Sequence, residues 1–241
     1  MSRSEPTTDA VLLRAVDYGE RDRVATLFTR SHGRLSAFAP GARGSRRRFV
    51  AAFEPFALIR VELVRGRGEL WRLRDATVSR AFGAVLRDLD RMAAASAALE
   101  IVRESVPEGA TDPEVLDEVI ALFEAIDRGE LPRQTLVGFA LRACAHLGHA
   151  PRLDACATCG RPRPRKKPAF FDGARGGVVC QSCGGGPIVL GAATLDRMQR
   201  TLDGEIVDWP AEPLAEAARV LVDHLQAQVG KELPCVGWLT R

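Results

Sequence analysis

The sequence predicts a multidomain α+β protein in which a small β-barrel, residues 1–80, precedes an α-helical domain, residues 81–241. Three observations predict this fold class. Short apolar runs that alternate with polar residues fill the first domain, helical periodicity begins after it, and two Cys-x-x-Cys pairs follow late in the chain. These pairs predict a zinc-binding insert at residues 154–190 that interrupts the helical domain.

Strand-like segments dominate the first domain. In ALIRVELV the apolar residues Ile59, Val61 and Leu63 alternate with polar neighbours, and the RGRG stretch that follows supplies the glycines of a hairpin turn. The predicted strands are 10–16, 23–29, 34–39, 57–64 and 69–76. Five short strands separated by turn residues favour a closed barrel such as the OB-fold, which binds nucleic acid on one face.

A basic loop, PGARGSRRRFVAAFEP, joins the third and fourth predicted strands. Its four arginines are Arg43, Arg46, Arg47 and Arg48. We expect them to follow a phosphate backbone, because basic grooves beside stacking surfaces are how such barrels hold single strands. A solvated run of charge is the alternative. Phe49 and Phe53 have helical spacing, which predicts a short helix that plugs the barrel core.

The second domain begins with an Ala- and Leu-rich helical stretch that contains no helix breaker. The next helix has clear boundaries: Thr111 or Asp112 can cap it, Pro113 lies in its first turn, and Gly129 ends it. The five predicted helices cover 84–106, 113–128, 132–146, 191–202 and 211–229. The cysteine insert separates the first three helices from the last two.

Charge is distributed unevenly along the chain, although the formal net charge is only +3. Residues 1–80 carry 16 Arg against 9 acids, and residues 156–190 carry 4 Arg and 2 Lys against 1 acid. The intervening and final segments are net acidic. This alternation favours a polyanion as the partner of the two basic segments, whereas the alternative is that the charge only keeps the surface soluble.

The polar start, MSRSEPTTDA, and the lack of a long apolar run predict a cytosolic protein with no membrane segment. In a reducing compartment, cysteine pairs are more typical of metal ligands than of disulfides. The spacing of Cys156, Cys159, Cys180 and Cys183 is that of a four-thiolate zinc ribbon. The glycine after each pair, Gly160 and Gly184, suits a turn with positive φ.

Four thiolates close the coordination shell of zinc, so we expect a structural ion and not a catalytic one. His146 and His149 could compete as ligands, and redox dithiols are a further alternative. The basic stretch RPRPRKK, residues 161–167, forms a stiff exposed arm that could contact phosphates or remain solvated. No Walker A motif, Ser-His-Asp set or paired carboxylates are present, which argues against an enzyme.

The order of these parts resembles the RecO family of recombination mediators. The resemblance lies in AVLLRAVDYGERDRVATLFTRSHGRLSAFAPGARGSRRRF, in FEPF and the hairpin ending LRDA, in RACAHLGHAPRLDACATCG, and in FFDGARGGVVCQSC. It implies an N-terminal OB-fold, a helical domain and a structural zinc insert. It also implies a non-enzymatic, nucleoid-associated protein that binds single- and double-stranded DNA, anneals strands, and helps load the RecA recombinase onto strands covered by single-strand-binding protein.

The resemblance further implies partners: RecR, the RecF pathway, and the C-terminal tail of the single-strand-binding protein. Annealing requires shielding of two like-charged strands, which arginines supply by displacing counterions. We therefore expect Arg72 and Arg74, on an exposed strand face, to join the loop arginines in binding DNA. Two other readings stay open, a zinc-ribbon factor that binds RNA or the ribosome, and a thiol-dependent enzyme.

Overall fold

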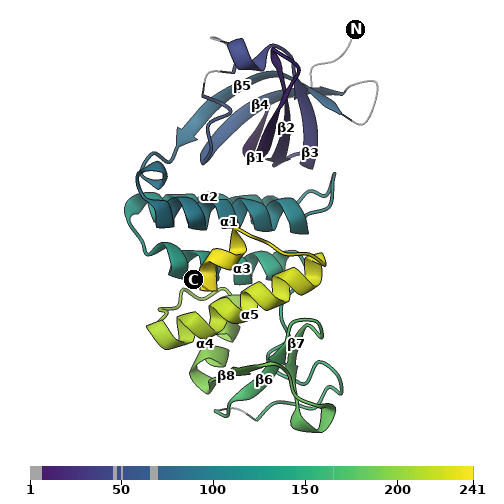
Figure 1. Cartoon of the computed structure of the whole chain (residues 1–241), viewed down its shortest axis with the longest axis vertical. Coiled ribbons are helices and arrows are strands. Elements are labelled where there is room, and N and C mark those ends of the chain that lie inside the picture. Colours follow the sequence, from purple (N-terminus) through teal and green to yellow (C-terminus); the bar gives the residue numbers. More distant parts are fainter. Residues whose placement is uncertain (1–6, 46–47, 50, 66–69, 165, 241) are drawn as a thin grey trace. The chain divides into compact units, whose positions relative to one another are not determined.

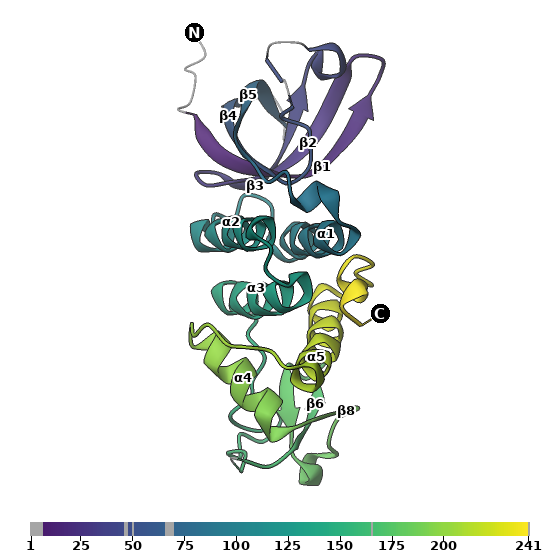
Figure 2. The same ribbon diagram turned by 90° about the vertical axis from the view of Figure 1, so that its left-hand side faces the viewer.

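A computed structural model describes residues 7–45, 48–49, 51–65, 70–164 and 166–240 (Figures 1 and 2). The chain divides into two compact units. One consists of the chain up to Asp88 together with Val102–Arg128, and the other of Leu89–Ile101 together with the chain from Gly129. Helix α1, Leu89–Ser105, therefore contributes residues to both units.

The first unit contains a closed five-stranded barrel, which confirms the predicted fold class. Its strands are β1 Thr8–Tyr18, β2 Asp22–Thr29, β3 Gly33–Ala39, β4 Ala57–Arg65 and β5 Trp71–Ala81. They pair in the order β1-β2-β3-β5-β4, and β4 pairs back onto β1. The β3–β5 pairing is parallel, whereas the other strand pairs are antiparallel.

Every second side chain of a strand points inward, and these side chains fill the barrel. On β3 the residues Leu35, Ala37 and Ala39 point inward and are buried, as are Ile59, Val61 and Leu63 on β4. Phe49 is buried in this core, as predicted, and Phe53 packs against it. The prediction of a short helix that plugs the barrel was wrong, because the described residues around Phe49 form turns. Left-handed backbone at Ala51 and Phe56, with φ of 57° and 59°, interrupts any helical path.

Helix α2, Pro113–Arg128, crosses one end of the barrel (Figures 1 and 2). Phe123 of α2 lies against Phe56 and Phe82, with ring centroids 5.9 and 5.4 Å apart. Asp112 caps the helix by accepting a 3.1 Å hydrogen bond from the Val115 amide, which confirms one of the two predicted caps. The segment before α2 lies so close to β3 that the Gly109 amide donates to the Arg34 carbonyl at 2.7 Å.

The second unit is helical. Besides part of α1, it contains α3 Pro132–His146, α4 Ala192–Leu202 and α5 Ala211–Val229. Together with α2 of the first unit, these account for all five predicted helices. α3 is the central one, because Leu136, Phe139 and Leu141 are fully buried. The buried carboxylate of Glu100 accepts hydrogen bonds from the Cys235 and Val236 amides at 2.8 and 2.9 Å, which fixes the C-terminal turn.

The cysteine region adds a small sheet that the sequence did not predict. Its strands are β6 Ala169–Asp172, β7 Gly177–Val179 and β8 Ile188–Leu190, in the order β7-β6-β8. The sheet packs on α5, where Phe171 meets His224 edge-on and the Gly173 amide donates to Asp223 at 2.8 Å. Within the described ranges, no helix is long and apolar enough to cross a membrane.

Candidate metal centre and nucleic-acid interface

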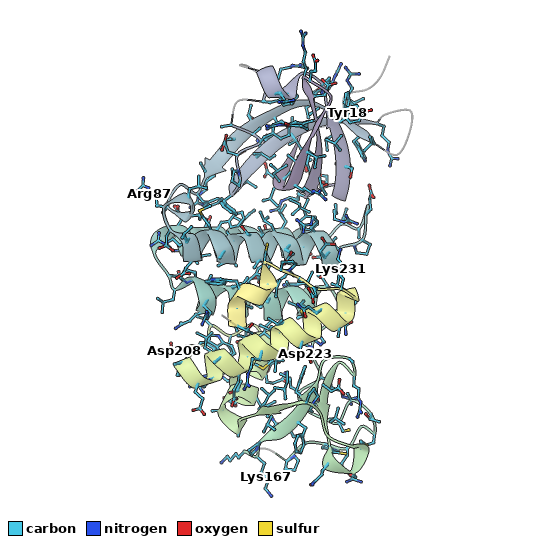
Figure 3. All side chains as sticks on the ribbon, in the orientation of Figure 1. Tyr18, Arg87, Lys167, Asp208, Asp223 and Lys231 are labelled. Atoms are coloured by element: carbon cyan, nitrogen blue, oxygen red, sulfur yellow. The ribbon has the colours of Figure 1, made fainter. Side chains whose placement is uncertain are left out.

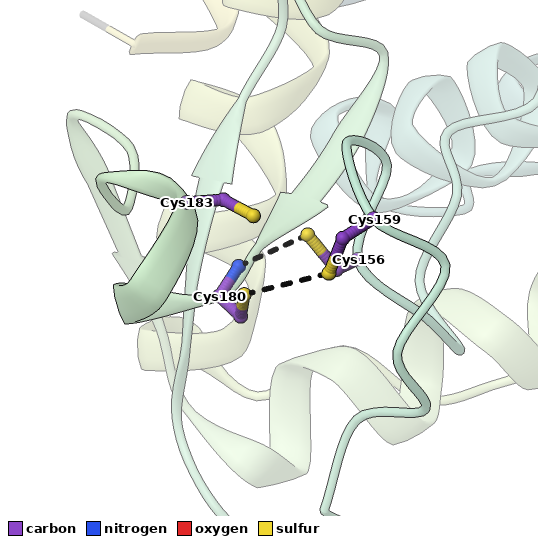
Figure 4. Close-up of side chains that lie close together, drawn as sticks. All are labelled: Cys156, Cys159, Cys180 and Cys183. Atoms are coloured by element: carbon purple, nitrogen blue, oxygen red, sulfur yellow. Dashed lines mark hydrogen bonds between the residues drawn. The ribbon is translucent and has the colours of Figure 1, made fainter.

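The two Cys-x-x-Cys turns meet in the insert (Figure 4). The first turn follows α3 and precedes β6, and the second follows β7 directly. Gly160 and Gly184 adopt positive φ values of 72° and 96°, as predicted, and each amide closes its turn onto a carbonyl three or four residues earlier. These turns direct all four thiols toward one point (Figure 4).

The geometry of the four sulfurs fits a tetrahedral metal ion. All four Sγ atoms lie within 4.8 Å of one another, and Cys159 Sγ is 3.8 Å from Cys180 Sγ. A tetrahedral zinc with bonds of about 2.3 Å requires sulfurs about 3.8 Å apart. Neither His146 nor His149 belongs to the cluster. The four cysteines therefore could hold a metal ion without a fifth ligand.

Hydrogen bonds within the cluster give its cysteine thiols different pKa values. The Cys180 and Cys159 amides donate toward Cys156 and lower the pKa of its thiol to about 6. The Ser182 hydroxyl lowers the pKa of Cys180, whereas hydrogen bonding with the Cys180 and Cys159 thiols raises the pKa of Cys183 to about 12. Metal binding to the cluster would therefore release a proton more readily from Cys156 than from Cys183.

Cys144 behaves differently from this cluster. Burial in α3 raises the pKa of its thiol to about 12, so it stays a neutral apolar side chain.

The outer face of the barrel presents a row of side chains that crosses four strands. Val16 of β1 is paired with Val24 of β2, Val24 with Phe38 of β3, and Phe38 with Arg72 of β5. We call Val16, Val24, Phe38, Arg72 and the adjoining Tyr18 the barrel row. It combines apolar, aromatic and cationic groups on one surface.

Several members of the barrel row are accessible to a ligand. Tyr18, labelled on the barrel in Figure 3, is 62% exposed. Its ring meets that of the half-buried Phe38 edge-on, with ring centroids 5.9 Å apart. Val16 is 41% exposed. Arg72 is exposed and has no hydrogen-bond or ion-pair partner among the described residues. Tyr18 and Phe38 were missed by the sequence reasoning. The alternation in RLSAFA could have identified Phe38, because its neighbours at positions 35, 37 and 39 point inward.

The other predicted DNA-binding arginines have protein partners where they are described. Arg43 pairs with Asp17 at 3.4 Å and donates to the Gly19 carbonyl. Arg48 donates to the Pro40 carbonyl at 2.9 Å and lies over the Phe49 ring. Arg74 pairs with Glu62 at 3.3 Å. Arg46 and Arg47 lie outside the described residues. The three described arginines lie at the surface, and their role in DNA binding stays a prediction.

Comparison with known proteins decides the family. The chain matches the family model described as Recombination protein O N terminal over residues 1–82 and Recombination protein O C terminal over residues 86–234. The chain belongs to the RecO family. Together the two matches cover both the barrel and the helical part that carries the cysteines.

Curated relatives agree with this RecO assignment. The chain is 41% identical to DNA repair protein RecO of Anaeromyxobacter dehalogenans over 97% of this chain and 94% of that protein. It is 37% identical to DNA repair protein RecO of Myxococcus xanthus, over 97% and 96% of the two chains. The corresponding protein of Geobacter sulfurreducens is 36% identical over 96% of both. The RecO resemblance is thereby confirmed, and the chain is a DNA repair protein of this family.

Proposed function

We propose that this RecO-family chain is a non-enzymatic recombination mediator. It binds single- and double-stranded DNA, anneals complementary strands, and helps load RecA onto DNA covered by single-strand-binding protein. The observation that carries the proposal is the barrel row, in which the Tyr18 and Phe38 rings lie on the same face as Arg72, which has no hydrogen-bond or ion-pair partner in the part of the chain that the structure describes. Aromatic rings stack on bases of any sequence, and a neighbouring guanidinium neutralises the phosphate.

The chemistry of annealing follows from these groups. A strand held by stacking and by phosphate contacts carries less repulsive charge, so a complementary strand can approach it. Stacking and phosphate contacts do not read base edges, so sequence preference should be slight. Arg43, Arg46, Arg47, Arg48 and Arg74 extend the cationic surface around the row in this proposal. The ion pairs of Arg43 with Asp17 and of Arg74 with Glu62 are exposed and therefore weak enough to exchange for phosphate contacts.

The metal of the cysteine cluster is proposed to be a structural Zn²⁺. Four soft thiolate ligands in a tetrahedron favour zinc, and a complete protein ligand set leaves no site for a reacting water. Cys156, Cys159, Cys180 and Cys183 would hold the ion, which would supply folding energy to the insert. In the cell, we propose action at the nucleoid with RecR, RecF, RecA and the tail of the single-strand-binding protein.

Strand annealing is the first test of this function. We expect the purified, zinc-loaded chain to speed pairing of two complementary oligonucleotides, both bare and covered with single-strand-binding protein. The measurement is fluorescence quenching between labelled strands in the presence and absence of that protein. No acceleration in either arm, or a stronger binding of structured RNA in direct competition, would contradict the proposal and favour an RNA-binding factor.

The loop arginines give a second prediction. Changing Arg46, Arg47 and Arg48 together to Ala should lower the slope of log affinity against log salt by about 2 for single strands, because each lost phosphate contact removes about 0.7. Fluorescence anisotropy across a salt series measures this slope. Arg60→Ala is the matched control, since Arg60 is an exposed arginine of β4 that belongs neither to the loop nor to the barrel row. A triple variant with the slope of this control would show that the loop does not bind phosphate.

A further inference from the structure

The basic arm of the insert, as far as the structure describes it (residues 161–164 and 166–167), is largely exposed, as expected, and its first residues pair with the preceding chain. Pro162 forms a bridge to Ala155, and the Arg163 amide donates to the Asp154 carbonyl at 2.8 Å. The Arg163 guanidinium donates to the carbonyls of Leu153, Pro164 and Lys167 at 2.9, 3.3 and 3.3 Å. Arg163 is therefore a structural clamp that holds the end of the arm in a fixed position.

A concave surface lies between this clamped arm and the small sheet. The cavity has a volume of about 620 Å³, and Pro162, Pro164, Pro168, Phe170 and Val179 form much of its apolar wall. Phe170 is 37% exposed although it lies in the middle of β6. A Cβ on Gly185 would come within 3.2 Å of the Phe170 ring, so the glycine backbone lies directly against the ring and supports it. Phe170 is thus an aromatic side chain held in place with part of its surface open.

Cations flank the cavity, and its lining contains no acid. Arg161 and Lys167 line the cavity, whereas Lys166, the chain neighbour of Lys167, is exposed and lines a separate hollow that residues of α4 also line. The side chains of Lys166 and Lys167 have no partner among the described residues, and Lys167 extends into solvent (Figure 3). The one acid in residues 156–190, Asp172, already pairs with Arg175 at 3.1 Å. The cavity therefore carries an uncompensated positive charge next to an apolar, partly aromatic floor.

We infer that this surface, which we call the insert platform and define by Arg161, Lys166, Lys167 and Phe170, is a second contact for single-stranded nucleic acid. One unpaired base stacks on Phe170, and the flanking phosphates bind the two lysines and Arg161. An apolar floor with a supported ring selects an unstacked base, which a duplex does not offer, and the cations select a polyanion. The inference rests on the proposed DNA-binding function, to which it adds a contact apart from the barrel row.

Three variants of the full, zinc-loaded chain test the platform. Phe170→Ala should weaken single-strand binding by about 5-fold or more through loss of stacking, and Phe170→Trp should restore it. Lys166→Ala with Lys167→Ala should lower the salt slope by about 1.4. Arg219→Ala is the matched control, because Arg219 is an exposed cation of α5 outside the cavity. Duplex affinity should change less than single-strand affinity in the Phe170→Ala variant.

A photocrosslink on the unmodified chain keeps the test independent of folding. Single-stranded DNA with halogenated uracil should crosslink to the peptide that contains Phe170, whereas no crosslink to that peptide would overturn the inference. Variants that retain zinc yet bind like Arg219→Ala would also overturn it, as would equal competition by a glutamate-rich peptide. If the chain bound no single-stranded DNA at all, the proposed function itself would fail. If only barrel-row variants lost binding, the platform alone would be wrong.

Discussion

Replacing Cys180 by Ser is expected to unfold the insert and leave the barrel intact. The insert has three strands of three or four residues, and few of its side chains are buried, among them Phe171, Val178 and Leu190. So small a core cannot offset the conformational entropy of its loops. Coordination of zinc by four thiolates contributes about 10 kcal/mol or more of apparent folding energy, most of which the variant would lose.

The measurement combines zinc content with limited proteolysis. The wild-type chain should carry one zinc ion and resist trypsin in the basic arm, whereas Cys180→Ser should lose the ion and be cut between residues 161 and 175. Cys235→Ser is the control, because Cys235 lies outside the cluster and should keep the metal. An insert that stayed resistant to trypsin without metal would show that the sheet and α5 hold it unaided.

Replacing Gly33 by Ala is expected to destabilise the first unit by about 3 kcal/mol or more. Gly33 begins β3 with a φ of 64°, and a Cβ there would lie 1.9 Å from the Ala110 carbonyl oxygen. The left-handed backbone costs a non-glycine residue about 1 kcal/mol, and the clash is with backbone atoms that cannot rotate away. The segment before α2 would have to move, and with it the Gly109–Arg34 and Arg34–Val106 hydrogen bonds.

Gly19→Ala separates the two contributions to this cost. Gly19 has nearly the same φ, 62°, but no atom lies within 4 Å of the position that a Cβ would take there. We therefore expect about 1 kcal/mol for Gly19→Ala, from backbone strain alone. Urea unfolding, with hydrogen exchange of β2 and β3 as the local readout, measures both variants. Equal destabilisation of the two would show that the close approach of Gly33 to Ala110 carries no energy.

Most elements could be predicted because their signals are local. The alternation at 57–64 and the cap and stop of α2 depend on neighbouring residues only. The first helix was predicted to begin at residue 84, but it begins at Leu89 because Val85–Arg87 form a 3₁₀ turn. The strands of the insert are too short for a periodic signal. The turn around Phe49 depends on left-handed residues that no alternation pattern marks.

The two candidate sites also differ in how far the sequence alone could identify them. Cysteine spacing identifies the metal cluster, because each Cys-x-x-Cys turn is a local feature of the sequence. Two such turns together supply the four ligands of one tetrahedral ion. The barrel row could not be identified as a unit, since the parallel β3–β5 pairing that sets Phe38 beside Arg72 joins distant parts of the chain. The alternation in the sequence placed Arg72 and Arg74 together on one exposed strand face. The structure distinguishes them, because Glu62 pairs with Arg74, whereas Arg72 has no such partner among the described residues.

The affinity of a Phe38→Ala/Arg72→Ala double variant for a short single-stranded oligonucleotide tests the central claim most directly. Loss of one stacked base and one phosphate contact should weaken binding by about 10-fold or more and lower the salt slope by about 0.7. Arg60→Ala, which also removes one positive charge from the barrel, should bind nearly as the wild type does. A double variant that keeps its fold, its affinity and its salt slope would contradict the assignment of the barrel row as the DNA-binding surface.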